Sequence, residues 1–317
     1  MARQRKRKGD PVHGWLNFNK PVGMTSTQAV GFVKRVMHAQ KAGHGGTLDP
    51  LADGILPIAL GEATKTSAYA MESDKDYTFH ISWGASTSTQ DREGDVIAES
   101  DVRPEPDAVA EILSKFVGEI DQVPPKFSAI KVNGERAYDL ARDGEEVELQ
   151  PRKVELFGAS LDPASTPETA IIHVTCGKGF YIRALVRDLA CELGAEGHVT
   201  VLKRTRVGAF DIRTSTDQAT LEAAETPEDC RGHLIALDAP LDDIPKLEIQ
   251  SSQLFRLRNG NDVQLLPHEL EQFRSQRMDL QGDESEDRLA LIMEHGQAVA
   301  LGEIRAGRFQ PIRVFQL

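Results

Sequence analysis

The alternation of hydrophobic and polar positions predicts several strands in the first two thirds of the chain. Successive side chains of a strand point to opposite faces, so a half-buried strand alternates with a period of two. Residues 77–84 keep this period strictly, and Pro21 and Gly23 end the first alternating run. The predicted strands cover residues 14–20, 55–60, 77–84, 171–176 and 199–208.

Apolar residues that recur every three to four positions predict helices between these strands. The first helix begins after a capping-box pair, Thr25 and Gln28, and continues to about His38. In another, Leu185 and Leu189 share the face that points to the core. Besides the first helix, the predicted helices cover residues 62–71, 107–117 and 182–193.

Residues 41–54 fit neither period. This stretch holds four glycines and a proline, so we expect an irregular loop, and it presents His44 and Asp49. Small residues allow close approach of a ligand, which favours a binding or catalytic site. The alternative is a simple turn, because Asp before Pro is a common turn former and neither phosphate-binding glycine motif is present.

Two later regions have a character of their own. Residues 124–152 begin with two prolines and contain a hairpin signal at Asn133-Gly134, then a possible short helix over 137–142. Residues 245–317 hold several short strand patterns and predict a small β-rich domain. Within it, we expect the acidic stretch 269–287 to be a surface loop.

Composition places the chain among ordinary globular proteins and narrows its chemistry. It has 317 residues, of which 40% are hydrophobic and 27% charged, enough for a large domain and a smaller one. No apolar run reaches the ~18 residues of a membrane span, and no signal peptide is recognised, so we expect a cytoplasmic protein. The three cysteines form no Cys-x-x-Cys pair, and the histidines lack zinc-ligand spacing, so we expect no metal.

Charge is distributed unevenly. The net charge of −12 argues against unselective binding of nucleic acid over the whole surface. Residues 1–8 nevertheless carry five basic side chains and no acid, and we expect residues 1–11 to form a basic disordered tail. This tail either contacts RNA or only increases solubility.

An ordered set of motifs runs from residue 12 to about residue 210. The motifs are GWLNFNKPVGMTS at 14–26, KAGHGGTLDPLADGILP at 41–57, GEATK at 61–65, DKDY at 74–77, QVPPKFSAIKVNGERAY at 122–138, KGFYIR at 178–183 and GHVTVLKRTR at 197–206. In this order they resemble the bacterial TruB-type tRNA pseudouridine-55 synthases.

The resemblance implies an α+β fold of the pseudouridine-synthase type. We expect a mixed, largely antiparallel sheet with flanking helices around a central cleft, and a small C-terminal β-rich domain similar to PUA RNA-binding domains. By the same resemblance, residues 12–240 form the catalytic domain, 124–152 its thumb-like insertion that clamps RNA, and 245–317 the PUA-like domain.

The resemblance also assigns the catalytic pair. Asp49 takes the position of the family's aspartate nucleophile, and Arg183 that of the arginine that pairs with it. Converting uridine to pseudouridine requires a carboxylate nucleophile and no cofactor or redox partner. A guanidinium beside a carboxylate favours its ionised form and orients it. Whether Asp49 attacks C6 of the base or C1′ of the ribose stays open.

Five further residues match family positions around the substrate. A uridine in a folded T-loop must be extruded before its ring atoms can react. Tyr77, Tyr181 and Leu202 match residues that hold the extruded base, His44 one that helps displace it, and Lys20 a lysine near the pocket. Without the resemblance, Tyr77 reads as a core residue, His44 as a solvated loop histidine and Lys20 as a solvated strand end.

The last motif contains a basic run, and the chain departs from the family pattern at three places. Lys203, Arg204 and Arg206 are expected to follow the tRNA backbone. The departures, which remove no catalytic group, are Phe127 in place of a frequent Tyr, Phe180 in place of Thr, and Gly45-Gly46 in place of a His/Thr pairing.

We therefore expect a monomeric enzyme that converts uridine 55 in the T-loop of tRNA to pseudouridine. It would bind the T-arm of tRNA and need no cofactor, membrane or protein partner. Three alternatives remain: a noncatalytic tRNA-binding or tRNA-folding protein on the same scaffold, a synthase for another RNA, and a hydrolytic glycosidase with Asp49 and Asp53 as paired carboxylates.

Overall fold

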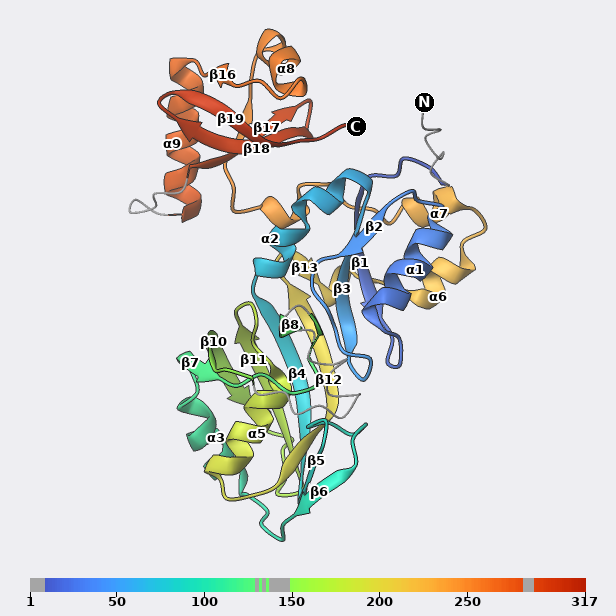
Figure 1. The fold of residues 1–317 in the computed structure, drawn as a ribbon, viewed down its shortest axis with the longest axis vertical. Helices are drawn as coiled ribbons and strands as arrows, with labels where there is room; N and C mark the ends of the chain where they lie inside the picture. Colours follow the sequence, from blue (N-terminus) through green and yellow to red (C-terminus); the bar gives the residue numbers. More distant parts are fainter. Residues whose placement is uncertain (1–8, 129–130, 133–134, 137–148, 282–287) are drawn as a thin grey trace.

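The computed structural model describes residues 9–128, 131–132, 135–136, 149–281 and 288–317. Two main sheets organise these residues (Figure 1). A large sheet extends through most of the molecule, and a smaller one, drawn in orange and red, lies at one end.

The large sheet has ten strands among the described residues. Seven of its strand pairs are antiparallel and two, β1 with β14 and β12 with β3, are parallel, which confirms the predicted largely antiparallel sheet. The order is β14 (Thr216–Asp217), β1 (Gly14–Lys20), β3 (Asp53–Leu60), β12 (Gly197–Val207), β4 (Lys75–Trp83), β11 (Thr169–Cys176), β10 (Arg152–Leu161) and β7 (Gly118–Gln122), with β13 (Phe210–Asp211) beside β12 and β2 (Ala42–His44) beside β3.

Helices and short hairpins surround this sheet. The predicted first helix is confirmed, and Thr25 and Gln28 form its capping box. The helical segments are α1 (Ser26–Val36), η1 (Gly61–Thr66), α2 (Ser67–Glu72), α3 (Pro106–Ser114), α5 (Ile182–Glu192), η2 (Ile212–Thr214), α6 (Gln218–Ala223), α7 (Pro227–Arg231) and η3 (Ala239–Leu241). The hairpins are β5 (Ala85–Thr87) with β6 (Val96–Glu99), and β8 (Lys131–Val132) with β9 (Glu135–Arg136).

The alternation along β4 separates a buried from a more exposed face of the sheet. Phe79 and Ile81 are fully buried, whereas His80 and Ser82, which alternate with them, are only half-buried. Helix α3 packs against β10, α5 packs against β12, and the two helices contact each other. The main hydrophobic core lies between these helices and the sheet.

The C-terminal region forms a five-stranded sheet with two helices. Its strand order is β15 (Lys246–Glu248), β17 (Leu289–Glu294), β18 (Gln297–Arg305), β19 (Arg308–Val314) and β16 (Val263–Gln264), and its helices are α8 (Ser251–Arg258) and α9 (Pro267–Gln281). The expected surface loop over 269–287 is therefore wrong up to Gln281. A helix forms there because Glu269 is buried and accepts a hydrogen bond from the backbone N–H of Leu266 at 2.7 Å. The remainder, 282–287, lies outside the described residues.

The two sheets share a hydrophobic cluster. Trp15 and Phe210 of the large sheet pack in the same buried cluster as Leu291, Leu301 and Phe315 of the small one. Two polar contacts reinforce this junction. Lys65 Nζ donates to the carbonyl of Val314 at 2.7 Å, and the backbone N–H of Gln316 donates to Glu62 at 2.9 Å.

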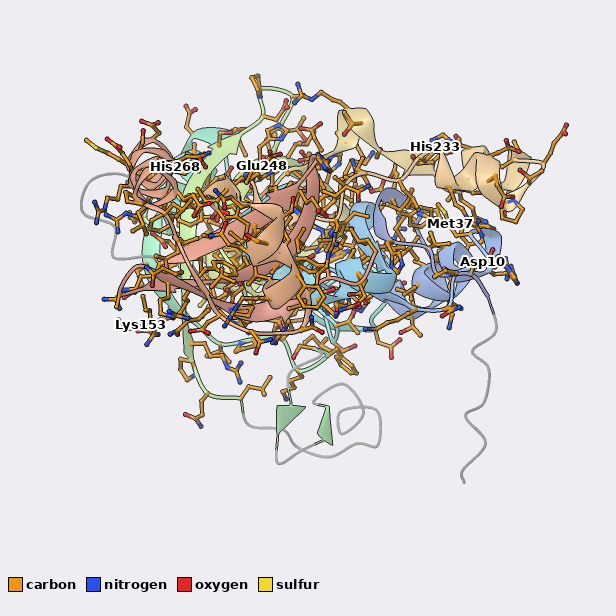
Figure 2. The ribbon with its side chains drawn as sticks, turned by 90° about the horizontal axis from the view of Figure 1, so that it is seen from above. Asp10, Met37, Lys153, His233, Glu248 and His268 are labelled. Carbon is orange, nitrogen blue, oxygen red and sulfur yellow. The ribbon has the colours of Figure 1, made fainter. Side chains whose placement is uncertain are left out.

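The structure corrects two further expectations. Residues 41–54 are not wholly irregular, because Ala42–His44 pairs with β3 as the short strand β2. The expected tail does not include Asp10, which lies beside Met37 (Figure 2) and forms an ion pair with Arg231. Its backbone N–H also donates to the carbonyl of His38 at 2.7 Å. Residues 1–8 lie outside the described residues.

Much of the segment 124–152 lies outside the described residues. The turn predicted at Asn133-Gly134 and the short helix predicted over 137–142 fall in the part that is not described. The strands β8 and β9 of this segment pair in antiparallel register. Among the helices of the described part, none is long and apolar enough to cross a membrane.

Candidate active site

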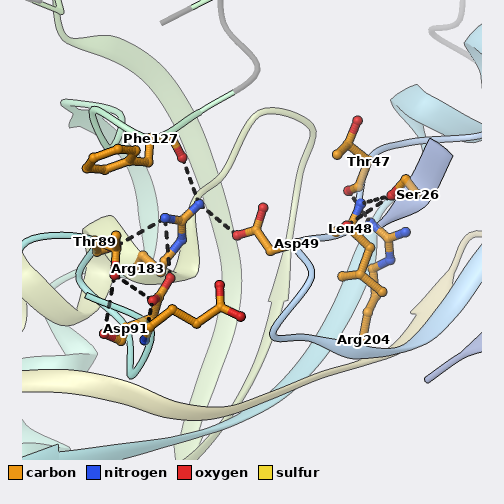
Figure 3. A network of polar contacts seen from close by, with 10 residues as sticks. Ser26, Thr47, Leu48, Asp49, Thr89, Asp91, Phe127, Arg183 and Arg204 are labelled. Carbon is orange, nitrogen blue, oxygen red and sulfur yellow. Dashed lines mark hydrogen bonds and ion pairs between the residues drawn. The ribbon is translucent and has the colours of Figure 1, made fainter. Parts of the chain in front are cut away.

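Asp49 lies in the loop that joins β2 to β3, and two side chains hold the backbone just before it. The Ser26 hydroxyl donates to the carbonyl of Leu48 and accepts from its N–H, both at 2.9 Å. Arg204 donates to the carbonyls of Gly46 at 3.2 Å and Thr47 at 3.1 Å. The backbone of residues 46–48, directly before Asp49, is thus held in place by these two side chains (Figure 3). No sequence pattern reveals such contacts, because they are made to backbone groups.

The backbone after Asp49 is held by Lys20. Its ammonium donates to the carbonyls of Ala52 at 2.5 Å and of Met24 at 2.8 Å, with a longer contact of 3.5 Å to Pro50. Lys20 is fully buried, and burial lowers its pKa to about 8. Lys20 therefore connects the end of β1 to the loop.

Gly54 permits the contact between this loop and β12. Its φ is +105°, a conformation that side chains rarely adopt, and an added Cβ would lie 2.2 Å from the carbonyl oxygen of Arg204. Arg204 also donates to the carbonyl of Ile55 at 2.7 Å. Only glycine allows the two strands to approach this closely.

Arg183 holds the Asp49 carboxylate. One guanidinium nitrogen of Arg183 lies 2.7 Å from Asp49 Oδ2, and another lies 3.4 Å from Asp91 Oδ2 (Figure 3). The same side chain donates to the carbonyls of Thr89 at 3.1 Å and Phe127 at 3.0 Å. Arg183 is 5% exposed, whereas the Asp49 side chain is 34% exposed, so the carboxylate is both oriented and accessible.

Asp91 is fixed in turn by its own loop. It is 2% exposed, and its Oδ1 accepts from the Thr89 hydroxyl at 2.6 Å and from the N–H of Glu93 at 3.0 Å. A buried carboxylate needs such partners, because an unpaired one is costly. Asp91 therefore keeps the guanidinium of Arg183 in place from the side opposite to Asp49.

A cavity of about 290 Å³ opens beside Asp49. The expected site residues among its lining are Asp49, Tyr77, Tyr181, Arg183, Leu202 and Arg204. Burial raises the pKa of both tyrosines, so their hydroxyls stay protonated at neutral pH. The backbone of Tyr181 is clamped by the buried Gln122 amide, which accepts from its N–H at 2.9 Å and donates to its carbonyl at 3.1 Å.

A larger cavity, of about 820 Å³, lies next to the residues whose carbonyls bind Arg183. Thr89 and Phe127, whose carbonyls accept from Arg183, are among the residues that line it. It does not include Asp49, Tyr77 or Tyr181 in its lining. Size alone would therefore select the wrong cavity for the carboxylate chemistry.

The other expected residues lie outside the lining of the smaller cavity. His44 ends β2, and its Nδ1 accepts from the N–H of Gly46 at 3.3 Å. Lys203 forms an ion pair with Asp53 at 3.1 Å, and Arg206 forms one with Asp76 at 2.6 Å.

Arg204 differs from what the basic run predicts. It is 1% exposed and its guanidinium donates to three carbonyls, so it supports the loop instead of lying on a surface that can follow a phosphate backbone. The physical reason is strand alternation. Successive residues of β12 point to opposite faces, so Lys203 and Arg204 cannot share one basic surface.

Two residues of this site carry no functional signal in the sequence. Asp91 lies outside every motif, and its role depends on a loop that folds back onto α5. Ser26 is the last residue of the first motif and the first residue of α1, directly after the N-cap Thr25, and nothing in that local pattern indicates a contact with Leu48. Within the described residues, no cluster of three or more His, Cys, Asp or Glu side chains is arranged to hold a metal ion.

Comparison with known proteins agrees with this geometry. The model of the TruB family pseudouridylate synthase (N terminal domain) matches residues 34–182. A protein named tRNA pseudouridine synthase B from Caulobacter sp. (strain K31) is 48% identical over 313 residues, covering 99% of each chain. One of the same name from Rhizobium meliloti (strain 1021) is 46% identical over 322 residues, again covering 99% of both.

The chain belongs to the TruB family of pseudouridylate synthases. It is thus an enzyme that forms pseudouridine, and the expected family and fold are confirmed. Two solved structures share the fold of this TruB-family chain. The chain from a Cbf5–Nop10–Gar1 complex has a TM-score of 0.67 at 23% identity and covers 99% of this chain and 92% of its own length. The chain from an H/ACA RNP bound to a substrate RNA has a TM-score of 0.68 at 20% identity.

Proposed function

We propose that this protein isomerises uridine 55 in the T-loop of tRNA to pseudouridine, with Asp49 as the nucleophile. The observation that carries the proposal is the accessible Asp49 carboxylate in the wall of the 290 Å³ cavity, held by the buried Arg183 at 2.7 Å. The relatives' name supports tRNA as the substrate. The position in the T-loop rests on the motifs.

The roles of the side chains follow from this arrangement. The uridine is extruded from its stack, at a cost of a few kcal/mol, and enters between Tyr77, Tyr181 and Leu202. Asp49 attacks C6 of the base or C1′ of the ribose. The bond between C1′ and N1 breaks, the base rotates, C5 bonds to C1′, and the proton of C5 is lost while N1 gains one. No atom is gained or lost overall, so the step needs no cofactor.

Other residues of the proposed interface act outside this cavity. His44 helps to displace the target nucleotide, and Lys203 and Arg206 contact the tRNA backbone after exchanging their present ion pairs for phosphates. Lys20 supports the loop from behind. Residues 12–240 serve as the catalytic domain, 124–152 as the clamp and 245–317 as a PUA-like RNA-binding domain. The protein acts as a cytoplasmic monomer without a protein partner.

The nucleophile is tested by Asp49→Asn with Asp53→Asn as the matched control. Asp53 also lies in the loop region but is ion-paired with Lys203. We expect Asp49→Asn to bind tRNA normally and to lose pseudouridine formation by roughly 10⁴-fold or more, because the nucleophile is absent. Asp53→Asn should stay active. An Asp49→Asn protein with normal product yield would remove Asp49 from the mechanism.

The substrate is tested by mapping pseudouridine in tRNA from cells with and without the gene. Loss of the signal at position 55 alone is expected. A signal that persists at this position would overturn the substrate assignment, and loss at other RNA sites would indicate a synthase of different specificity. Release of free uracil in vitro would instead indicate a hydrolytic glycosidase.

A further inference from the structure

Lys75 is a buried cation in the wall of the same cavity. It begins β4, is 7% exposed and lines the 290 Å³ cavity with Asp49. Its ammonium donates to the carbonyl of Met71 at 2.6 Å and to that of Ser73. These two bonds use two of its three N–H groups, and both acceptors are neutral.

Asp74 and Glu72 act on the charge of Lys75 only from a distance, without a direct ion pair. Within the part of the chain that the structure describes, no acidic side chain forms an ion pair with it, and the nearby Glu72 pairs with Lys178 at 3.0 Å. Burial lowers the pKa of Lys75 to about 8. Removing a charge from water without a charged partner costs free energy. An anionic ligand beside the Lys75 ammonium would lower that cost.

The position of Lys75 relative to Tyr77 indicates which anion fits. The two residues are separated by one position on β4, so their side chains point to the same face, roughly 7 Å apart along the strand. Both line the cavity. In a nucleotide, the sugar separates the base from its phosphates. A base against Tyr77 therefore brings a phosphate within reach of a cation one step further along the strand.

We propose that Lys75 Nζ binds a phosphate of the extruded nucleotide and thereby holds that nucleotide in the cavity. The inference rests on the proposed function, because it requires a flipped nucleotide beside Tyr77. A phosphodiester carries a full negative charge throughout binding, and an ammonium meets it as a point charge. The uracil ring, in contrast, enters the cavity neutral and becomes negative only while its glycosidic bond is broken.

The first experiment measures tRNA affinity against salt concentration in the Asp49→Asn background, which binds without turnover. We expect Lys75→Met to weaken binding about tenfold at low salt and to reduce the magnitude of the log–log slope by about 0.7 to 0.9. Lys75→Arg should retain most of the slope. Lys153→Met is the control, because Lys153 is exposed, pairs with Glu119 and is not among the residues that line the cavity.

A second experiment uses a neutral phosphate in the RNA. A T-arm RNA with a methylphosphonate on either side of the target uridine should bind more weakly to the Asp49→Asn protein. The loss should disappear in Asp49→Asn/Lys75→Met, because the contact is already absent. If the loss of affinity from Lys75→Met and the loss from the methylphosphonate add fully at both methylphosphonate positions, the proposal is overturned. If Lys75→Met does not fold, the equally uncharged Lys75→Gln replaces it, and an unchanged methylphosphonate effect in that variant overturns the proposal equally.

The outcomes also separate this inference from the proposed function. A Lys75→Met protein with normal affinity and salt slope but slow catalysis would place the cation beside the departing uracil and refute the phosphate contact. A wild-type protein that makes no pseudouridine at position 55 would refute the proposed function. The phosphate contact is read from binding to the T-arm and not from product.

Discussion

Two buried arginines lie on either side of Asp49, and they meet different partners. Arg183, near the start of α5, faces the carboxylates of Asp49 and Asp91. Arg204, on β12, faces the carbonyls of three loop residues. One arginine therefore orients the reactive side chain, and the other orients the backbone that carries it.

The difference in partners predicts a difference in electrostatics. Arg183 shares its charge with two acids, so removing it leaves the buried Asp91 carboxylate and the partly exposed Asp49 carboxylate without their cation. Arg204 has neutral acceptors, so removing it leaves unsatisfied carbonyls but no uncompensated charge. Substitutions at the two positions should accordingly differ in the size of their effects and in whether they leave charges or carbonyls without a partner.

The largest effect is expected for Arg183→Met. Breaking a buried ion pair by removing one partner costs about 3–5 kcal/mol, so the free energy of unfolding should fall by this amount. Pseudouridine formation should fall by roughly 10³-fold, because Asp49 loses its orientation. Denaturant unfolding and single-turnover assays measure the two effects. Arg187→Met is the control on the same helix, and a similar loss there would contradict a specific role for Arg183.

A smaller effect is expected for Arg204→Met. Each carbonyl left without its donor costs about 1–3 kcal/mol if it stays buried, and water will relieve part of that cost. We expect a loss of about 3 kcal/mol in unfolding free energy and roughly 10²-fold in kcat, with tRNA affinity little changed. Arg213→Met is the control, because Arg213 is exposed and its ion pair with Asp211 does not contact the loop. Weakened tRNA binding with normal kcat would show that Arg204 contacts RNA after all.

The contrast between these arginines also shows where sequence was informative. Period-two alternation and the capping box at Thr25 predicted the strands and α1, because both are local patterns. The motifs predicted Asp49 and Arg183 as a pair. The tertiary partners were not predictable in this way. Asp91, Ser26 and the carbonyl contacts of Arg204 join segments far apart in sequence, and backbone groups look the same at every position.

Helix α9 shows a second limit. Its sequence is rich in charged residues and has no strong apolar stripe, so it resembles a solvated loop. What makes it helical is tertiary. Glu269 is buried near its start, and Phe273 packs into the core of the small sheet. Packing against a sheet can therefore stabilise a helix that local patterns do not predict.

A finer test of the backbone support is Ser26→Ala. The variant removes both hydrogen bonds to Leu48 without changing any charge. We expect kcat to fall about tenfold and the unfolding free energy to fall by about 1–3 kcal/mol, since two hydrogen bonds are lost and each contributes about 0.5–1.5 kcal/mol net. Ser26→Thr should restore most of the rate. Ser114→Ala, which loses a bond to the exposed Glu111 carbonyl, serves as control. Full activity of Ser26→Ala would show that Arg204 alone is sufficient.

The last prediction concerns a gradual effect of pH through Lys20. Its folded pKa of about 8 lies below its usual value of 10.5, so between these pH values the unfolded chain binds a proton that the folded chain does not. Stability should therefore rise with pH in this window, by up to ~1 kcal/mol per pH unit. Lys20→Met should lose the contribution of Lys20, so its stability should rise less from pH 8 to 10 than that of the wild type, in which Lys75 titrates over the same range. If the pH profiles of the two proteins are parallel, Lys20 does not titrate in this range.

The junction between Val314–Gln316 and the segment Glu62–Lys65 has a consequence for synthesis of the protein. The segment that receives these contacts follows directly after β3, the strand that leaves the Asp49 loop. The residues that complete it are translated 249 and 254 positions later. The segment Glu62–Lys65 can therefore obtain these contacts only after Gln316 has emerged from the ribosome, and a nascent chain of 240 residues should hold this segment less firmly than a chain that includes residues 314–316.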